Sequence, residues 1–200
     1  MPLSKRLFDL ILSVILIVLL LPVYLLLALL VLLFMGPPVL FRQERPGYGG
    51  SPFFILKFRS MTAAPDDSRQ AQNDAARLTP IGRVMRSLSL DELPELLNIL
   101  RGEMSFVGPR PLLMQYLPLY SAKQMRRHEA YPGLTGWSQV HGRNILDWKS
   151  RFELDVWYVD HWSFWLDIRI LMLTIWKVLT REGINQPGEA TTEYFTGNRD

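Results

Sequence analysis

The chain has 200 residues, of which 48% are hydrophobic and 20% charged, which is enough apolar content for one domain with appendages. The formal net charge is only +3 and no basic run is present, so nothing favours a nucleic-acid-binding protein. The absence of cysteine excludes disulfides and thiolate metal sites. His128, His141 and His161 lie too far apart in sequence for a helical zinc motif, so the metal to expect is a hard cation on oxygen ligands.

An apolar segment without charges covers residues 10–35, and Lys5 and Arg6 precede it. As one helix it would extend roughly 39 Å, more than the ~30 Å hydrocarbon core of a bilayer, so it predicts a membrane helix. Pro22 lies near the middle, and each half alone is too short to cross. Two alternatives stay open: a re-entrant helix that breaks at Pro22, with both ends on one side, and a kinked helix that spans.

Two short strands, residues 39–42 and 53–59, are predicted around the turn-rich segment 46–52. Strand alternation places Lys57 and Arg59 on the same face. That face is either simply solvated or, beside a carboxylate that handles diphosphates, a clamp for phosphate.

The polar segment 62–77 predicts a loop, either a lid over a substrate or a passive surface loop. Thr79 and Pro80 then open a short helix through their preference for the N-cap and the first helical position. This helix carries Arg86, a candidate site residue five positions before Asp91.

Two adjacent carboxylates, Asp91 and Glu92, precede apolar residues with the i, i+3, i+4, i+7 spacing of one buried helix face. Pro94 suits only the first turn of a helix, so the helix is predicted to begin near Asp91. One interpretation of the pair is capping, because Asp is a favoured N-cap and Ser89 with Glu92 matches a capping box. The other is chemistry at a phosphate, because such a carboxylate can attack phosphorus or hold a divalent metal.

A rigid turn follows, in which Pro109 and Pro111 flank Arg110 and present one guanidinium suited to bidentate phosphate contact. The segment 132–137 is turn-rich, and Arg143 lies in the polar run after it.

Residues 152–179 are helical and apolar but interrupted by charges, so they predict amphipathic helices rather than a second span. These helices would lie against the domain or in the headgroup plane. The proposed interfacial anchors are Trp157, Trp162, Trp165 and Trp176.

Three motifs, R-S-L-S-L-D-E-L-P-E-L-L-N-I-L (86–100), G-E-M-S-F-V-G-P-R-P (102–111) and P-G-L-T-G-W-S-Q-V-H-G-R-N (132–144), resemble in this order those of the small monotopic phosphoglycosyl transferases. These are the bacterial initiating sugar transferases of glycan assembly, and the resemblance covers residues 5 to about 196. One departure is Leu21, where the family usually has a Ser whose hydroxyl could satisfy a carbonyl freed by the helix break. The C-terminal T-T-E-Y-F-T-G-N resembles members that transfer N,N'-diacetylbacillosamine-type sugars.

The resemblance implies an α+β, mainly helical fold. Residues 1–35 would form a re-entrant membrane helix, residues 36–182 a small catalytic domain with short strands and interfacial amphipathic helices, and residues 183–200 a tail. The expected location is the bacterial inner membrane, as a monotopic protein with its catalytic domain on the cytoplasmic face. The oligomeric state stays open, with a homodimer as one alternative.

By the same resemblance, Asp91 attacks the sugar-bearing phosphate of a UDP-sugar and expels UMP, and the phospho-sugar then passes to polyprenol (undecaprenyl) phosphate. The expected cofactor is Mg²⁺, with Asp91 and Glu92 as ligands. The expected partners are the UDP-sugar, polyprenol phosphate and membrane lipid, without nucleic acid. The residues expected to bind substrate are Lys57, Arg59, Arg86, Pro109, Arg110, Pro111 and Arg143.

Two other hypotheses are weighed against this one. A metal-dependent diphosphatase tethered to the membrane would hydrolyse nucleotide-sugars with water and need no polyprenol. An interfacial scaffold would recruit other glycan enzymes, and its function would survive the change Asp91→Asn.

Overall fold

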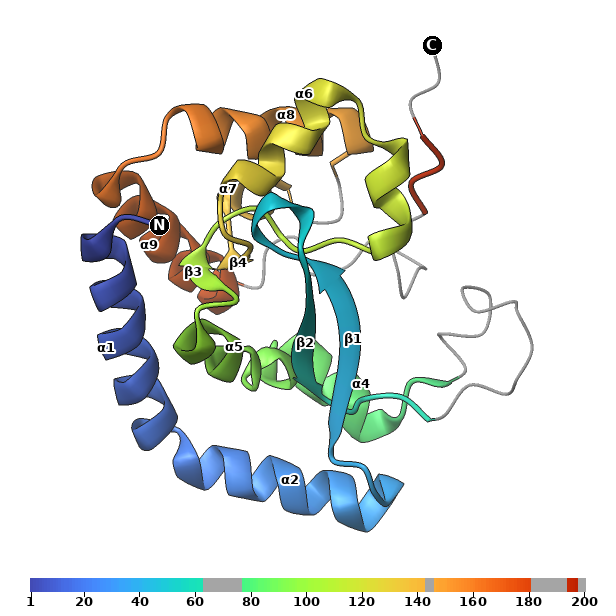
Figure 1. Cartoon of the computed structure of the whole chain (residues 1–200). Coiled ribbons are helices and arrows are strands. Elements are labelled where there is room, and N and C mark those ends of the chain that lie inside the picture. The colour runs from blue at the N-terminus through green and yellow to red at the C-terminus, as the bar shows by residue number, and fades with distance from the viewer. Residues whose placement is uncertain (63–76, 143–145, 181–193, 198–200) are drawn as a thin grey trace.

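The structure is a computed structural model that describes residues 1–62, 77–142, 146–180 and 194–197. Within these residues the chain is mainly helical with two small sheets, in agreement with the predicted fold class (Figure 1). Arg143 lies outside the described residues, as do nearly all of the predicted loop 62–77 and of the predicted tail.

The N-terminal apolar segment forms two helices, α1 (Leu3–Leu19) and α2 (Leu21–Met35), which meet at an angle of 63°. The bend falls at Leu20, because Pro22 has no N–H to donate and its ring clashes with the carbonyl of Val18 in a continuous helix. At about 26 Å and about 23 Å, neither helix is long and apolar enough to cross a bilayer alone, and only the bent pair together meets the length and composition expected of a membrane segment. The helix-break-helix prediction is confirmed, with the break two residues before Pro22.

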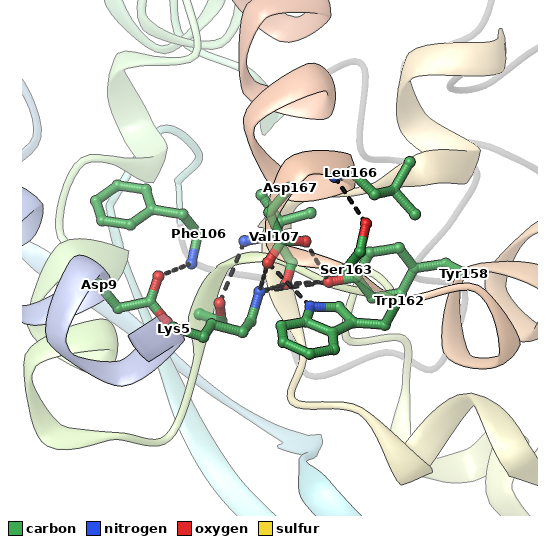
Figure 2. A network of polar contacts seen from close by, with 10 residues as sticks. Lys5, Asp9, Phe106, Val107, Tyr158, Trp162, Ser163, Leu166 and Asp167 are labelled. Atoms are coloured by element: carbon green, nitrogen blue, oxygen red, sulfur yellow. Dashed lines mark hydrogen bonds and ion pairs between the residues drawn. The ribbon is translucent and has the colours of Figure 1, made fainter. Parts of the chain in front are cut away.

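A buried polar cluster fastens the start of α1 to the C-terminal helices α8 (Trp148–Asp160) and α9 (Phe164–Thr180), as Figure 2 shows. The Lys5 ammonium lies 2.5 Å from the Asp167 carboxylate and donates to the carbonyl of Val107 at 2.9 Å. Tyr158 and Trp162 donate to the same carboxylate at 2.7 and 3.0 Å. Lys5 is therefore half of an internal ion pair rather than a cation free to face lipid headgroups.

The two N-terminal helices also contact α5 (Glu95–Arg101) and the residues between it and the acid pair. Arg6 donates to the carbonyls of Ile99 and Leu100 at 2.6 and 2.8 Å, at the end of α5 where carbonyls lack helical partners. The Tyr24 hydroxyl of α2 donates to the carbonyl of Leu93. The apolar segment is thus bonded to the domain near its start and again within its second helix.

The predicted hairpin is formed by β1 (Leu40–Pro46) and β2 (Pro52–Phe58), joined through a 3₁₀ turn at Tyr48–Gly50. The antiparallel register pairs Phe41 with Lys57 and Arg45 with Phe53. The helix predicted after Thr79 is α4 (Pro80–Ser87), and the Thr79 hydroxyl accepts from the Gly82 nitrogen at 2.9 Å as an N-cap.

A second sheet pairs β3 (Ser105–Val107) with β4 (Gly133–Thr135) in parallel. The chain between them holds the 3₁₀ segments Met114–Leu119 and Arg126–Glu129 and the short helix α6 (Ala122–Met125). A Cβ atom at Gly133 would lie 2.1 Å from the Gly108 nitrogen, so only glycine permits this approach of two backbones. Gly133 also donates to the Pro109 carbonyl at 3.0 Å, which fixes the start of the Pro-Arg-Pro turn.

The main core lies among β2, α5, β3, α7 (Trp137–Gly142), α8 and α9. Asn98 of α5 is fully buried, and its side chain accepts from the Leu56 nitrogen at 3.0 Å and donates to the Phe54 carbonyl at 2.7 Å. These two bonds hold α5 against β2, and therefore hold the acid pair beside Lys57.

The C-terminal apolar stretch forms two helices, as predicted, separated at residues 161–163. Trp165 and Trp176 of α9 are exposed, at 78% and 62%, as amphipathic anchors would be. Trp162 does not fit its prediction as an anchor, because it is partly buried and its indole N–H bonds to Asp167.

Candidate active site

The acid pair lies in a 3₁₀ turn, Leu90–Glu92, and α5 begins only at Glu95. The prediction that a helix begins near Asp91 is therefore wrong by one turn. Ser89 has a left-handed backbone, with φ 55°, and its side chain caps nothing, because an N-cap residue needs an extended backbone. The predicted capping box is not formed, and neither acid is an N-cap of α5.

Glu92 is held by two cations from different elements. Its Oε1 accepts from the Lys57 ammonium of β2 at 2.7 Å and from the Arg110 guanidinium of the Pro-Arg-Pro turn. Burial acts to raise the pKa of Glu92, but Arg110 and Lys57 outweigh it and hold that pKa well below its usual range. Glu92 is therefore an ionised carboxylate whose charge orients Lys57 and Arg110.

Asp91 is buried, at 7% exposure, yet its carboxylate has no hydrogen bond or ion pair within the part of the chain that the structure describes. Burial and the neighbouring Glu92 raise its pKa, while Lys57, Arg86 and Arg110 act in the opposite direction. The geometry thus separates two adjacent acids: Glu92 is occupied by cations, and Asp91 keeps its lone pairs for a reacting atom or a metal.

Glu95 is a site residue that the sequence reading missed. It is 1% exposed, and its Oε1 lies 3.1 Å from the Lys57 ammonium, so that Lys57 sits between two carboxylates. Burial, with the charge of Glu92, raises the pKa of Glu95 to about 7, although Lys57 acts to lower it. Its position three residues after Glu92 could have indicated a shared side of the chain.

Arg86 of α4 also belongs to this cluster. Its guanidinium donates to the Ser60 hydroxyl at 3.1 Å and acts electrostatically on Asp91. The structure therefore brings Lys57, Arg86 and Arg110 around the acid pair, as the sequence predicted.

Arg59 does not join this cluster. It follows the last residue of β2, and its guanidinium donates to the carbonyls of Met35, Gly36 and Pro37 at the end of α2. The structure does not support the prediction that Arg59 shares a phosphate-binding face with Lys57. The Arg59 N–H still bonds to the Val39 carbonyl at 3.0 Å, but the free carbonyls of a helix C-terminus attract its guanidinium.

Replacing Arg59 by Gln should therefore lower the free energy of unfolding by about 1–2 kcal/mol, the range for lost charge-assisted bonds at a helix end. The KM for the nucleotide-sugar that the resemblance implies as substrate should stay within about twofold of wild type. Chemical unfolding and steady-state kinetics check the two parts separately. A large rise in KM with unchanged stability would return Arg59 to the substrate site.

The Pro-Arg-Pro turn is supported by a buried ion pair. Arg127 donates to the Arg110 carbonyl at 2.8 Å and lies 2.7 Å from Asp155 of α8, and both side chains are about 1% exposed. Asp155 also accepts from the Ser138 hydroxyl at 2.6 Å. Since the Arg110 backbone is fixed in this way, its guanidinium can be directed at Glu92.

His128, next to Arg127, is buried and bonds to the Gly47 carbonyl at 3.2 Å. Its other ring nitrogen has no hydrogen-bond partner among the described residues. Burial and the charge of Arg127 lower the pKa of His128 to about 4. The folded protein therefore holds a neutral imidazole where an unfolded chain would protonate near 6.5.

Because the pKa of His128 is lower in the folded than in the unfolded protein, protonation at low pH favours the unfolded chain. The stability from this group is present above about pH 6.5 and is lost as pH falls through about 4. Between pH 7 and pH 4 the folded state should lose about 3 kcal/mol through this group. Urea unfolding at several pH values should show a smaller loss for His128→Asn. His161→Asn, at an exposed position, should lose as much free energy of unfolding between pH 7 and pH 4 as wild type does. An equal loss in all three proteins would contradict this role of His128.

Within the described residues, no group of three or more His, Cys, Asp or Glu side chains converges as a metal site. Among the described residues, the Asp91 carboxylate and the second oxygens of Glu92 and Glu95 are the cluster's carboxylate oxygens with neither a hydrogen bond nor an ion pair. A metal ion here would need further ligands from substrate or water.

Comparison with known proteins relates this chain to bacterial sugar transferases. A model of the bacterial sugar transferase family matches residues 2–181. The uncharacterized sugar transferase EpsL of Bacillus subtilis is 54% identical over 196 residues, which cover 98% of this chain and 97% of that protein. A UDP-glucose:undecaprenyl-phosphate glucose-1-phosphate transferase of Caulobacter vibrioides is 42% identical, over 90% of this chain and 71% of its own length. The exopolysaccharide production protein ExoY of Rhizobium meliloti is 38% identical, over 90% and 87% respectively.

Proposed function

Because this chain belongs to the bacterial sugar transferase family, we propose that it moves a sugar 1-phosphate from a UDP-sugar to polyprenol phosphate, with undecaprenyl phosphate as the acceptor. The observation that carries the proposal is the unequal acid pair. Glu92 is bound by Lys57 and Arg110, whereas Asp91 has no partner within the described residues. One acid therefore organises the cations and the other is left as a nucleophile.

In the first step an Asp91 oxygen attacks the sugar-bearing phosphorus of the donor. A bond from Asp91 to phosphorus forms, the bond from that phosphorus to the bridging oxygen breaks, and UMP leaves with the electron pair. In the second step a phosphate oxygen of the lipid attacks the same phosphorus, and Asp91 leaves as the free carboxylate. The products are UMP and polyprenyl diphosphate-sugar, and the kinetics are ping-pong.

Lys57, Arg86 and Arg110 stabilise the charge on the transferring phosphate and the leaving group. Glu92 holds two of these cations in place before substrate arrives. Arg143, outside the described residues, is proposed as a further phosphate contact.

The free oxygens of Asp91 and Glu92 suit Mg²⁺, which typically takes one or two carboxylates together with substrate phosphates. The ion would neutralise charge that develops on the phosphates during transfer. Activity should accordingly disappear on chelation and return with added Mg²⁺.

For the membrane arrangement we propose a re-entrant α1–α2 pair at the bacterial inner membrane, with the catalytic domain on the cytoplasmic face. Support comes from bonds of this segment to the domain at both ends: Lys5 and Arg6 at its start, and Arg59 at the end of α2. A spanning helix would have to place its two ends on opposite sides of the bilayer. We retain residues 36–182 as the catalytic domain and residues 183–200 as its tail.

The test uses the full chain in nanodiscs with Mg²⁺, undecaprenyl phosphate and a panel of UDP-sugars. The panel includes glucose, after the Caulobacter relative, and an N-acetylated sugar, after the C-terminal motif. We expect UMP and lipid-linked sugar in equal amounts, and UMP release that depends on the lipid beyond one turnover. Continued release of UMP and sugar phosphate without lipid would instead identify a diphosphatase.

A further inference from the structure

Arg45 lies near the end of β1 and is not among the predicted site residues. Within the described residues it forms no ion pair. Its guanidinium lies 2.5 Å from the amide oxygen of Gln43 and 3.5 Å from the carbonyl of Pro111. Its Nε is buried and has no acceptor within the described residues. No carboxylate of the described chain lies within ion-pair distance of it.

The neighbouring arginines differ from it in this respect. Arg110 has Glu92 as its counter-charge, and Arg127 has Asp155. Arg45 as a whole is only partly buried, but its Nε is shielded from water. Shielding a cation without a counter-charge is costly, and an anion placed against it recovers part of that cost. Burial, and then the charge of Arg110, lower the pKa of Arg45 to about 10, which is consistent with an excess of positive charge here.

We propose that Arg45 and Arg110 together form a subsite for a phosphate, occupied by the nucleotide-side phosphate of the donor and afterwards by the phosphate of UMP. This inference rests on the proposed function and extends it by one binding residue. Arg45 touches the carbonyl of Pro111, and Arg110 precedes that residue and reaches back to Glu92. A diphosphate could therefore have its sugar-bearing phosphate at the acid pair and its other phosphate between the two arginines.

The lipid acceptor also carries a phosphate that could occupy this subsite, but the fold favours the phosphate of the nucleotide. The β1–β2 hairpin begins beside α2 and extends away from it (Figure 1). Lys57 is paired with Phe41 near the α2 end, whereas Arg45 lies four residues further along β1, about 13 Å at the usual strand rise. A lipid held by the apolar α1–α2 pair would approach from the opposite end.

The experiment measures UMP binding to the full chain in nanodiscs by calorimetry, which needs no turnover. For Arg45→Gln we expect the Kd for UMP to rise about tenfold to a hundredfold, as for loss of a charge-assisted phosphate contact. Arg45→Lys should recover part of this affinity. Uridine, which has no phosphate, should bind both proteins alike, and the KM for undecaprenyl phosphate should stay within about twofold.

The matched control is Arg42→Gln on the same strand, since Arg42 is exposed and lies over the Phe54 ring. It should leave the Kd for UMP within about twofold. Melting temperatures identify any variant that has lost its fold, and for such a variant Arg45→Lys carries the comparison. A Kd for UMP unchanged in folded Arg45→Gln, or an effect confined to the KM for the lipid, would overturn the inference while leaving wild-type transferase activity intact. If wild type transfers no sugar but binds UMP through Arg45, the proposed function fails and the subsite stands.

Discussion

Replacing Asp91 by Asn is expected to remove sugar-phosphate transfer, with a loss of at least about a thousandfold in kcat. The amide has nearly the shape of the carboxylate but is a much poorer nucleophile. Because Asp91 has no hydrogen bond or ion pair in the described part of the chain, the change should not disturb the cation cluster. Intact-protein mass spectrometry with UDP-sugar and without lipid should show a phospho-sugar adduct on wild type and none on Asp91→Asn.

The matched variant is Glu92→Gln, which keeps Asp91 and removes the charge that holds Lys57 and Arg110. It should turn over more slowly than wild type but still form the adduct, and undecaprenyl phosphate should discharge that adduct. An adduct that persists in Asp91→Asn would move the nucleophile to another residue. Turnover without an adduct in any protein would favour direct transfer.

Lys5→Met is expected to destabilise the folded chain by about 3–5 kcal/mol, because it leaves the Asp167 carboxylate buried without its cation. Tyr158 and Trp162 still donate to that carboxylate, but neither neutralises it (Figure 2). For a chain of this length the melting temperature should fall by roughly 10 °C. Thermal unfolding in nanodiscs measures the change.

The double variant Lys5→Met with Asp167→Asn should be more stable than Lys5→Met alone, since no uncompensated charge is then left in the interior. The surface control is Asp160→Asn, which breaks an ion pair with Arg126 in which both side chains are about 40% exposed. It should leave the free energy of unfolding close to that of wild type, because water and salt screen an exposed ion pair. Similar losses for the buried and the exposed pair would contradict the role given to Lys5.

Much of the fold was predictable where a pattern is local. The uncharged apolar segment and its proline predict two helices with a break, and Thr79 with Pro80 predicts the start of α4. Arg110 could be selected because a proline-flanked Arg is suited to phosphate. For the acid pair the residues alone left capping and phosphate chemistry open, and only the family resemblance favoured the second. The predictions that the structure does not support concern one side-chain contact and one boundary. The Arg59 guanidinium bonds to the end of α2, and α5 begins one turn after Asp91.

The sequence by itself determined which residue types are available and where the apolar segments lie, because helix and strand periodicity and proline geometry act over a few neighbouring residues. Only the tertiary structure decided which charges meet. Glu92 forms ion pairs with cations 35 residues before it and 18 after it, while adjacent Asp91 has none in the part of the chain that the structure describes. Lys5 is bound by a carboxylate 162 residues away, and Arg45 is left without one in the described chain. Electrostatic partnership depends on distance in space and on burial, and neither follows from separation along the chain.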